Sequence, residues 1–165
     1  MLSLYDLIPA AGGYLFTNDA GDQYYVYLTE YGLLDPRSPN EEAYINAFML
    51  GFSCKRSNPH LRPHYDTKSK ATILFVFKEF IDRYPGEAFV YVCDNRDGLA
   101  RNRRVTFARW FNEENTAYER HHSQISYGEI NWYSAILIRT GNANKQLLIN
   151  AYYYTLQQML NARNE

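Results

Sequence analysis

The feature that most constrains the fold is an apolar run in the middle of the chain. Residues 88–92 read Ala-Phe-Val-Tyr-Val, aliphatic or aromatic at every position. Such a run is typical of a strand buried on both faces, and therefore central in its sheet. It continues to Cys93, with a helical pattern before it and another after it. The chain is therefore expected to combine strands with helices packed on them.

Alternating segments before this run predict a β-hairpin. Residues 14–17 and 23–29 flank the sequence Asn-Asp-Ala-Gly at 18–21, whose residues tolerate positive φ. A third strand is expected over 44–52. The first part of the chain thus predicts three meandering strands.

Tyrosine is in marked excess, at sixteen of 165 residues. This side chain buries a large ring while its hydroxyl stays in water, so it is common at interfaces and on half-exposed sheet faces. Tyr25 and Tyr27 share one face of their strand, and the opposite face carries Tyr24, Val26 and Leu28. Two interpretations stay open: a sheet with one solvated face, or an interaction surface that includes Tyr25 and Tyr27.

A helical stripe separates the third strand from the central one. Its apolar residues recur on one helix face: Ile73, Leu74, Phe77, Phe80, Ile81 and Tyr84. Asp66 or Thr67 is expected to cap its start, and Pro85 with Gly86 ends it. The chain therefore crosses from the third strand to the central strand through a helix.

A further helix, two strands and a final helix are expected after the central strand. The helix begins at Asp97, and the strands cover about 118–125 and 130–139. The first of these two strands is polar on both faces, which is typical of an edge. A helix over 143–160 closes the chain. We predict one globular α+β domain over 1–165, with a mixed sheet of about six strands in the order β-β-β-α-β-α-β-β-α and helices packed on it.

This order resembles the topology of the GNAT acetyltransferases over about 14–139. The resemblance implies acetyl-coenzyme A bound before the first crossover helix, where that family carries a Gln/Arg-x-x-Gly-x-Gly/Ala loop. The matching segment, 65–72, reads Tyr-Asp-Thr-Lys-Ser-Lys-Ala-Thr and has no glycine. Side chains there would crowd the backbone approach that holds a pyrophosphate, so no cofactor is expected in the usual manner.

The sequence is also similar to an uncharacterised family of small bacterial proteins. The similarity lies in Asp-x-x-Asp-Gly at 94–98, Arg-Asn-Arg at 101–103 and Arg-Trp-Phe at 109–111. It implies a bacterial origin and no particular activity.

The polar cluster after the central strand is the candidate ligand site. It combines carboxylates, an amide and guanidiniums where a strand ends and a helix begins: Asp94, Asn95, Asp97, Arg101, Arg103 and Arg104. Amides at a helix start attract anions, and guanidiniums add bidentate donors. The alternative is structural, with Asp97 as an N-cap and Arg103 paired to Asp94 or Asp97 on the apolar stripe.

Composition disfavours several other classes. A net charge of −1 argues against a nucleic-acid footprint, and no apolar stretch approaches the ~20 residues of a membrane span. The first residues lack a basic region and an apolar core, so a cytoplasmic location is expected.

His60 and His64 have the spacing of helical zinc ligands, but Pro63 argues against a helix there. No metal site is predicted.

The sequence favours a non-catalytic binding or protein-interaction module on a degenerate acyltransferase-like scaffold. The reasons are the absent loop glycines, the lack of an acid/base pair and the excess of tyrosine. The expected partner is another protein or a second copy of the chain, and a small anionic ligand is a further option. The alternative is an N-acyltransferase-like enzyme with an atypical site for acetyl-coenzyme A.

Overall fold

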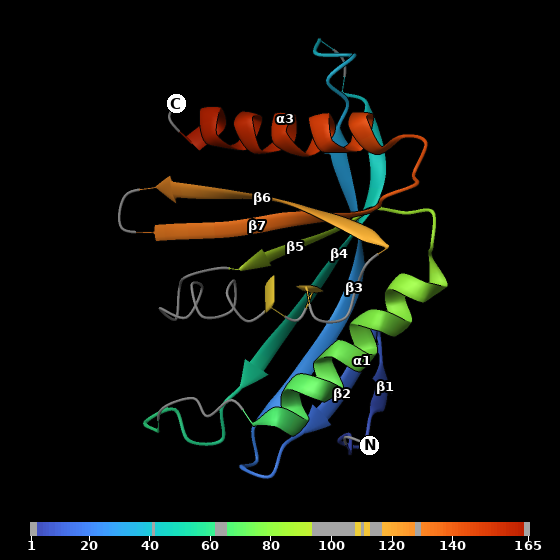
Figure 1. Cartoon of the computed structure of the whole chain (residues 1–165). Coiled ribbons are helices and arrows are strands. Elements are labelled where there is room, and N and C mark those ends of the chain that lie inside the picture. Colours follow the sequence, from blue (N-terminus) through green and yellow to red (C-terminus); the bar gives the residue numbers. More distant parts are fainter. Residues whose placement is uncertain are drawn as a thin grey trace. The chain divides into compact units, whose positions relative to one another are not determined.

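The chain is an α+β protein with a mixed seven-stranded sheet. The computed structural model describes residues 3–40, 42–61, 66–93, 108–109, 111–112, 117–127 and 130–163. The strand order is β1-β2-β3-β4-β5-β7-β6 (Figure 1). The chain divides into two compact units, Met1–Thr29 with Leu50–Pro85, and Glu30–Met49 with Gly86–Glu165. The expectation of a single domain stays a prediction.

The first unit begins with the predicted hairpin. β2 (Gly13–Thr17) pairs antiparallel with the start of β3 (Gln23–Leu34), and β1 (Ile8–Ala10) pairs with the other side of β2. The turn between β2 and β3 needs a left-handed backbone at Gly21, where φ is 82°. The end of β4 (Tyr44–Lys55) also belongs to this unit.

α1 (Thr67–Arg83) supplies the core of the first unit. Asp66 caps its start as predicted, and its last residue precedes Tyr84 and Pro85. The apolar stripe packs through aromatic rings: Phe80 lies 6.1 Å from Tyr14 and Phe77 lies 6.5 Å from Phe52, between ring centroids. The buried apolar side chains of this unit are Tyr5, Phe16, Tyr24, Val26, Leu50, Ile73, Val76, Phe77 and Phe80.

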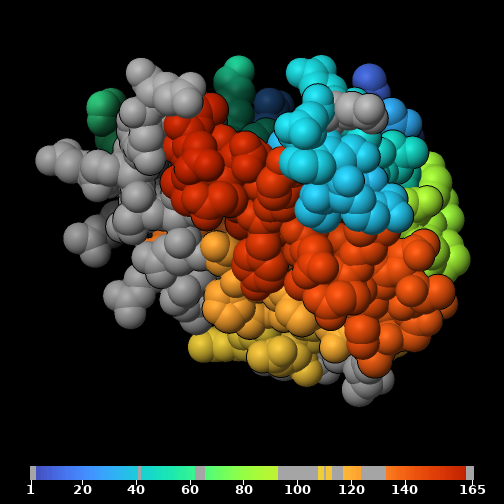
Figure 2. All heavy atoms as spheres, turned by 90° about the horizontal axis from the view of Figure 1, so that it is seen from above, coloured from blue at the N-terminus to red at the C-terminus, as the bar shows by residue number. Residues whose placement is uncertain are grey.

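The second unit contains β5 (Phe89–Cys93), β6 (Tyr118–Tyr127), β7 (Ile130–Arg139) and α3 (Lys145–Arg163). β7 pairs antiparallel with both β5 and β6. Figure 2 shows α3 in red, seated between residues of the 30–49 segment in cyan and the last strands in orange. Its buried face forms a core with the sheet: Leu33, Ala47, Ala88, Val90, Ile136, Ile138, Leu148, Ala151, Tyr152 and Leu156.

Several element predictions are confirmed. The strand over 88–93 is internal, with β4 and β7 as neighbours, and the polar strand is an edge that extends to Tyr127. The final helix starts and ends slightly later than expected, at Lys145 and Arg163. Among the described helices none is both long and apolar enough to cross a membrane.

Other boundaries were wrong. β1 was missed because three residues with Pro9 carry no alternating pattern, so the sheet has seven strands instead of about six. β3 and β4 also continue beyond their predicted ends, to Leu34 and Lys55. The second helix, expected from Asp97, lies largely outside the described residues; within it, residues 108–109 and 111 are helical.

Candidate functional site

The polar cluster predicted after the central strand lies wholly outside the described part of the chain. Its six residues are Asp94, Asn95, Asp97, Arg101, Arg103 and Arg104. Both interpretations of that cluster, a ligand site and a buried ion pair, therefore stay predictions.

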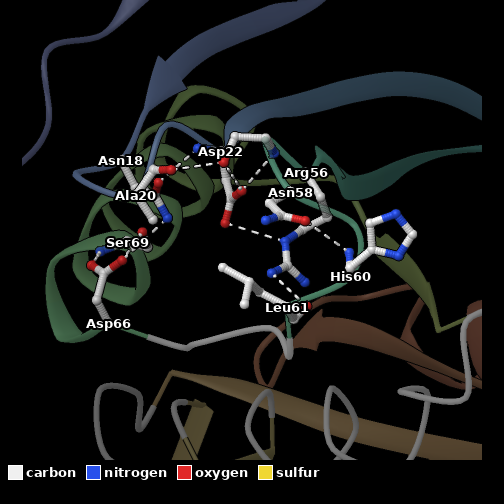
Figure 3. A network of polar contacts seen from close by, with 10 residues as sticks. Asn18, Ala20, Asp22, Arg56, Asn58, His60, Leu61, Asp66 and Ser69 are labelled. Carbon is white, nitrogen blue, oxygen red and sulfur yellow. Dashed lines mark hydrogen bonds and ion pairs between the residues drawn. The ribbon is translucent and has the colours of Figure 1, made fainter.

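The start of α1 is the position at which the acetyltransferase resemblance implies a pyrophosphate. There, the Asp66 carboxylate accepts hydrogen bonds from Ser69, at 2.5 Å from its backbone nitrogen and 2.7 Å from its hydroxyl. Tyr5 Oη lies 3.4 Å from the same carboxylate. Asn18 Nδ2 also lies 3.4 Å from it (Figure 3). The N-terminus of a helix stabilises a nearby negative charge. In this chain the Asp66 carboxylate supplies that charge, at the position where the resemblance implies a pyrophosphate.

A second polar cluster ties the hairpin to the loop after β4. The Asp22 carboxylate is buried and accepts a hydrogen bond from the backbone N–H of Ser57 at 2.8 Å. Arg56 Nε lies 3.3 Å from the same carboxylate (Figure 3). Ser57 Oγ donates to Ala20 O at 2.7 Å. The Ser57 amide and then the Arg56 charge hold the pKa of Asp22 below its ordinary value, against the opposing effect of burial. Because these groups bind one another, we assign the cluster a structural role.

His60 forms no metal site with other described residues. His60 is exposed in the loop after β4, where its backbone N–H donates to Asn58 Oδ1 at 3.1 Å. His64 lies outside the described residues. Within the described ranges no three His, Cys, Asp or Glu side chains are grouped to hold an ion.

One face of the first unit's sheet carries Tyr25 and Tyr27, as the alternation predicted. We call it the open face, because α1 packs on the opposite one. Directly paired residues of antiparallel strands share a face, and the register joins Ile8 to Leu15, Leu15 to Tyr25, and Gly13 to Tyr27. Ile8 is 61% exposed and Leu15 is 40% exposed. The open face therefore comprises Ile8, Ala10, Gly13, Leu15, Thr17, Gln23, Tyr25, Tyr27 and Thr29.

The two tyrosine rings of the open face are held in place by the chain itself. They stack with centroids 5.5 Å apart, and Tyr25 Oη donates to Ala11 O. Tyr27 lies over Gly51 of β4, where a Cβ atom would overlap the ring. Burial raises the pKa of Tyr27, and the neighbouring Tyr25 adds to that effect, so its phenol stays neutral. The face presents rigid, half-buried aromatic surface.

The open face is also nearly free of charge. Its residues from β1, β2 and β3 are all aliphatic, aromatic, hydroxyl or amide side chains or glycine. β4 continues it through Gly51 and, by alternation, Ser53 and Lys55. Lys55, at the strand end, is the one charged residue among the described members of this face. Contiguous exposed apolar surface with little charge marks interaction sites.

The residues Ile8 and Leu15 were missed by sequence reasoning. Leu15 lies in a predicted strand. Its place beside Tyr25, however, follows from the pairing register of the two strands, which the hairpin turn sets. Ile8 lies in a strand that was not predicted at all. The available signal for Leu15 was the predicted strand over 14–17, in which successive side chains point to opposite faces.

The second unit buries a pair of hydroxyl groups beneath α3. Ser134 Oγ and Tyr152 Oη are 2.5 Å apart and both side chains are buried. Burial is the main reason why the pKa of Tyr152 lies far above its ordinary value, although the bond to Ser134 opposes the shift. A phenol so hard to ionise is unsuited to proton transfer near neutral pH. We assign this pair a structural role.

The fold and the site define an α+β protein whose first unit carries an aromatic sheet face with little charge among its described residues. Residues 65–153, more than half of the chain, match the family of unknown function DUF6169. The chain belongs to this family, which confirms the predicted membership of an uncharacterised family. No curated protein matches the chain. No solved structure matches it either.

Proposed function

We propose that the chain is a non-catalytic protein-interaction module and that the open face is its contact surface. The observation that carries this proposal is the row Ile8, Leu15 and Tyr25, in which two exposed aliphatic side chains lie beside a fixed ring. Rigid tyrosines contribute contact area at a low cost in conformational entropy. The scarcity of charge on the face fits the centre of an interface, from which charged residues are depleted.

The polar groups of the described residues support a binding role over catalysis. The carboxylates of Asp22 and Asp66 are each engaged with backbone or side-chain donors of the same unit. The buried hydroxyl pair of Ser134 and Tyr152 is closed on itself. We therefore extend the proposal to a degenerate acyltransferase-like scaffold that no longer binds the cofactor.

Calorimetric titration with acetyl-coenzyme A tests this part of the proposal. The Asp66 carboxylate would repel the cofactor's pyrophosphate at the start of α1, so we expect no saturable heat at millimolar cofactor. Saturable binding in the micromolar range would contradict a module without cofactor and would favour the acyltransferase alternative.

Site-specific photo-crosslinking tests the contact surface. A photoreactive amino acid replaces Leu15 on the open face or, as the matched control, Phe75 on α1, which is similarly exposed at 48%. In cells that produce the protein, we expect a protein adduct from position 15 and none from position 75. Ile8→Lys should abolish the adduct, because it buries a charge at the contact. Equal adducts from both positions, or none from position 15, would overturn the proposal.

A further inference from the structure

We infer that the outer edge of β6 binds an extended acidic segment of a partner protein, which adds to the sheet as a further strand. β6 is the last strand of the sheet and pairs with β7 along its whole length (Figure 1). No described strand pairs with its outer edge. Both strands belong to the second unit, so the inference goes beyond the proposed function and does not depend on it.

Two hydrogen bonds show which backbone groups of β6 point away from β7. Ala117 O accepts from Thr140 N at 2.9 Å on the inner side, whereas His122 O accepts from Tyr153 Oη of α3 at 3.2 Å. Backbone groups alternate between the two sides of an antiparallel strand. The N–H and C=O groups of the even-numbered residues 118 to 126 therefore point outward. Within the described ranges, the Tyr153 phenol is the one group bonded to this row.

β6 lacks the usual structural obstacles to strand addition. Edge strands are commonly blunted by short length, proline or a bulge. β1, at the other end of the strand order, is three residues long with Pro9 at its centre. β6 is ten residues long, contains no proline and keeps one register with β7 throughout. Tyr153 is 41% exposed, so an added strand can replace its hydroxyl at His122 O. Such an edge is a template for main-chain pairing with an extended peptide.

One face of this edge carries positive charge. Tyr118, Arg120 and His122 share that face by alternation, and the register adds Arg139, directly opposite Tyr118. The Arg139 guanidinium lies over the Tyr118 ring, with Cζ 5.6 Å from the ring centroid. His122 is exposed, and its imidazole is a further hydrogen-bond donor.

This charge selects an acidic partner. Within the described part of the chain, neither Arg120 nor Arg139 forms an ion pair, and Glu119 lies on the opposite face, where it pairs with Lys145 at 2.9 Å. Arg120 is half-buried, so an ion pair there is screened less than one in open water. Acidic side chains at alternate positions of an added strand would meet these guanidiniums. A second copy of β6 would instead bring like charges onto one face.

Selection from a library of random peptides as long as β6, on the purified chain, tests the inference. We expect the enriched peptides to carry Asp or Glu at every second position and no proline at their centre. Arg120→Gln should weaken a selected peptide about 10-fold, through the loss of a charge-assisted hydrogen bond. Arg83→Gln, the matched change at an exposed arginine of α1, should leave the affinity unchanged. Thermal melting of both variants confirms that the fold is intact.

Backbone methylation of a selected peptide provides the decisive arm, because it leaves the protein unchanged. Peptide amides that donate to β6 alternate with amides that point away from it. N-methylation at one set of alternate positions should therefore abolish binding, and N-methylation at the other set should be tolerated. Hydrogen exchange should slow at the outward amides of residues 118, 120 and 122 when the peptide is added, and not when the protein concentration alone is raised.

Several results would overturn the inference. These are no enriched peptide, enrichment without alternating acidic residues, or equal effects of the two methylation sets. Equal competition by inorganic phosphate would reduce the surface to an anion subsite. Protection of the same amides by raised protein concentration would assign the edge to a second copy of the chain. Crosslinking from position 15 on the open face is independent of each of these results, so the proposed function is judged separately.

Discussion

The Asp66 carboxylate binds both donors of Ser69, its backbone N–H at 2.5 Å and its hydroxyl at 2.7 Å. This pairing satisfies one of the amides that every helix start leaves without an intrahelical partner. It also places a negative charge where an anionic cofactor would have to bind. One residue thus stabilises the start of α1 and, under the proposed function, disfavours an anionic cofactor there.

Replacing Asp66 should measurably weaken the fold. We expect Asp66→Ala to lower the free energy of unfolding by about 1–2 kcal/mol, the usual cost of an N-cap. Urea denaturation followed by circular dichroism measures it. Asp82→Ala is the matched control, because Asp82 lies on the same helix but pairs with Lys78 at the surface. Similar midpoints for the two variants would show that the cap contributes little.

Acid should weaken the Asp22 cluster. The Ser57 amide and the Arg56 charge depress the pKa of Asp22, so its stabilising contribution is complete above the ordinary carboxyl pKa of 3.8. It is lost as the pH falls from there through the lower, folded-state pKa. Asp22→Asn should cost about 1–3 kcal/mol at neutral pH and reduce the loss of stability on acidification.

Denaturation midpoints measured from neutral pH down to the acid transition check this. Asp82→Asn, which removes an exposed carboxylate, is the matched control. An acid limb for Asp22→Asn that is as steep as the wild type's would contradict the assignment.

Alkali should weaken the contact between Ser134 and Tyr152. Burial raises the pKa of Tyr152 above the ordinary value of 10.0, so the neutral phenol stabilises the folded state below that pH. As the pH rises beyond it, the unfolded phenol ionises first and stability falls. Tyr152→Phe should remove this contribution and cost about 1–2 kcal/mol at neutral pH, because the buried Ser134 hydroxyl loses its partner.

A double-mutant cycle isolates the contact. Adding Ser134→Ala to Tyr152→Phe should recover part of the loss, since no polar group is then left unpaired. Strictly additive losses would argue against direct coupling. Tyr153→Phe, at the exposed neighbour, serves as the control.

Gly51 should resist a larger side chain because Tyr27 lies over it. A Cβ atom at Gly51 would overlap the Tyr27 ring, whereas a Cβ at Gly86 meets nothing within 4 Å. We expect Gly51→Ala to destabilise by about 1–3 kcal/mol, as overpacking does. Gly86→Ala is the control and should change stability little. Thermal unfolding measures both, and the Gly51→Ala penalty should shrink in a Tyr27→Ala background.

The features that the sequence could predict are those set by neighbours along the chain. The hairpin turn at 18–21, the cap at Asp66 and the internal strand after Ala88 were all predictable, because each rests on local backbone preference or a short pattern. The shared face of Tyr25 and Tyr27 follows in the same way from a period of two. The cluster that begins at Asp94 lies outside the described residues, and its two interpretations stay predictions.

Tertiary structure decided which distant residues meet. β1 exists because Ile8 to Ala10 pair with β2, and such pairing is a property of two strands that no window along the chain contains. The same holds for Tyr27 over Gly51 and for Ser134 beside Tyr152. The sequence determined that tyrosines line one face of a strand. Only the pairing register placed Ile8 and Leu15 beside them, because a shift of one residue would turn those side chains to the other face.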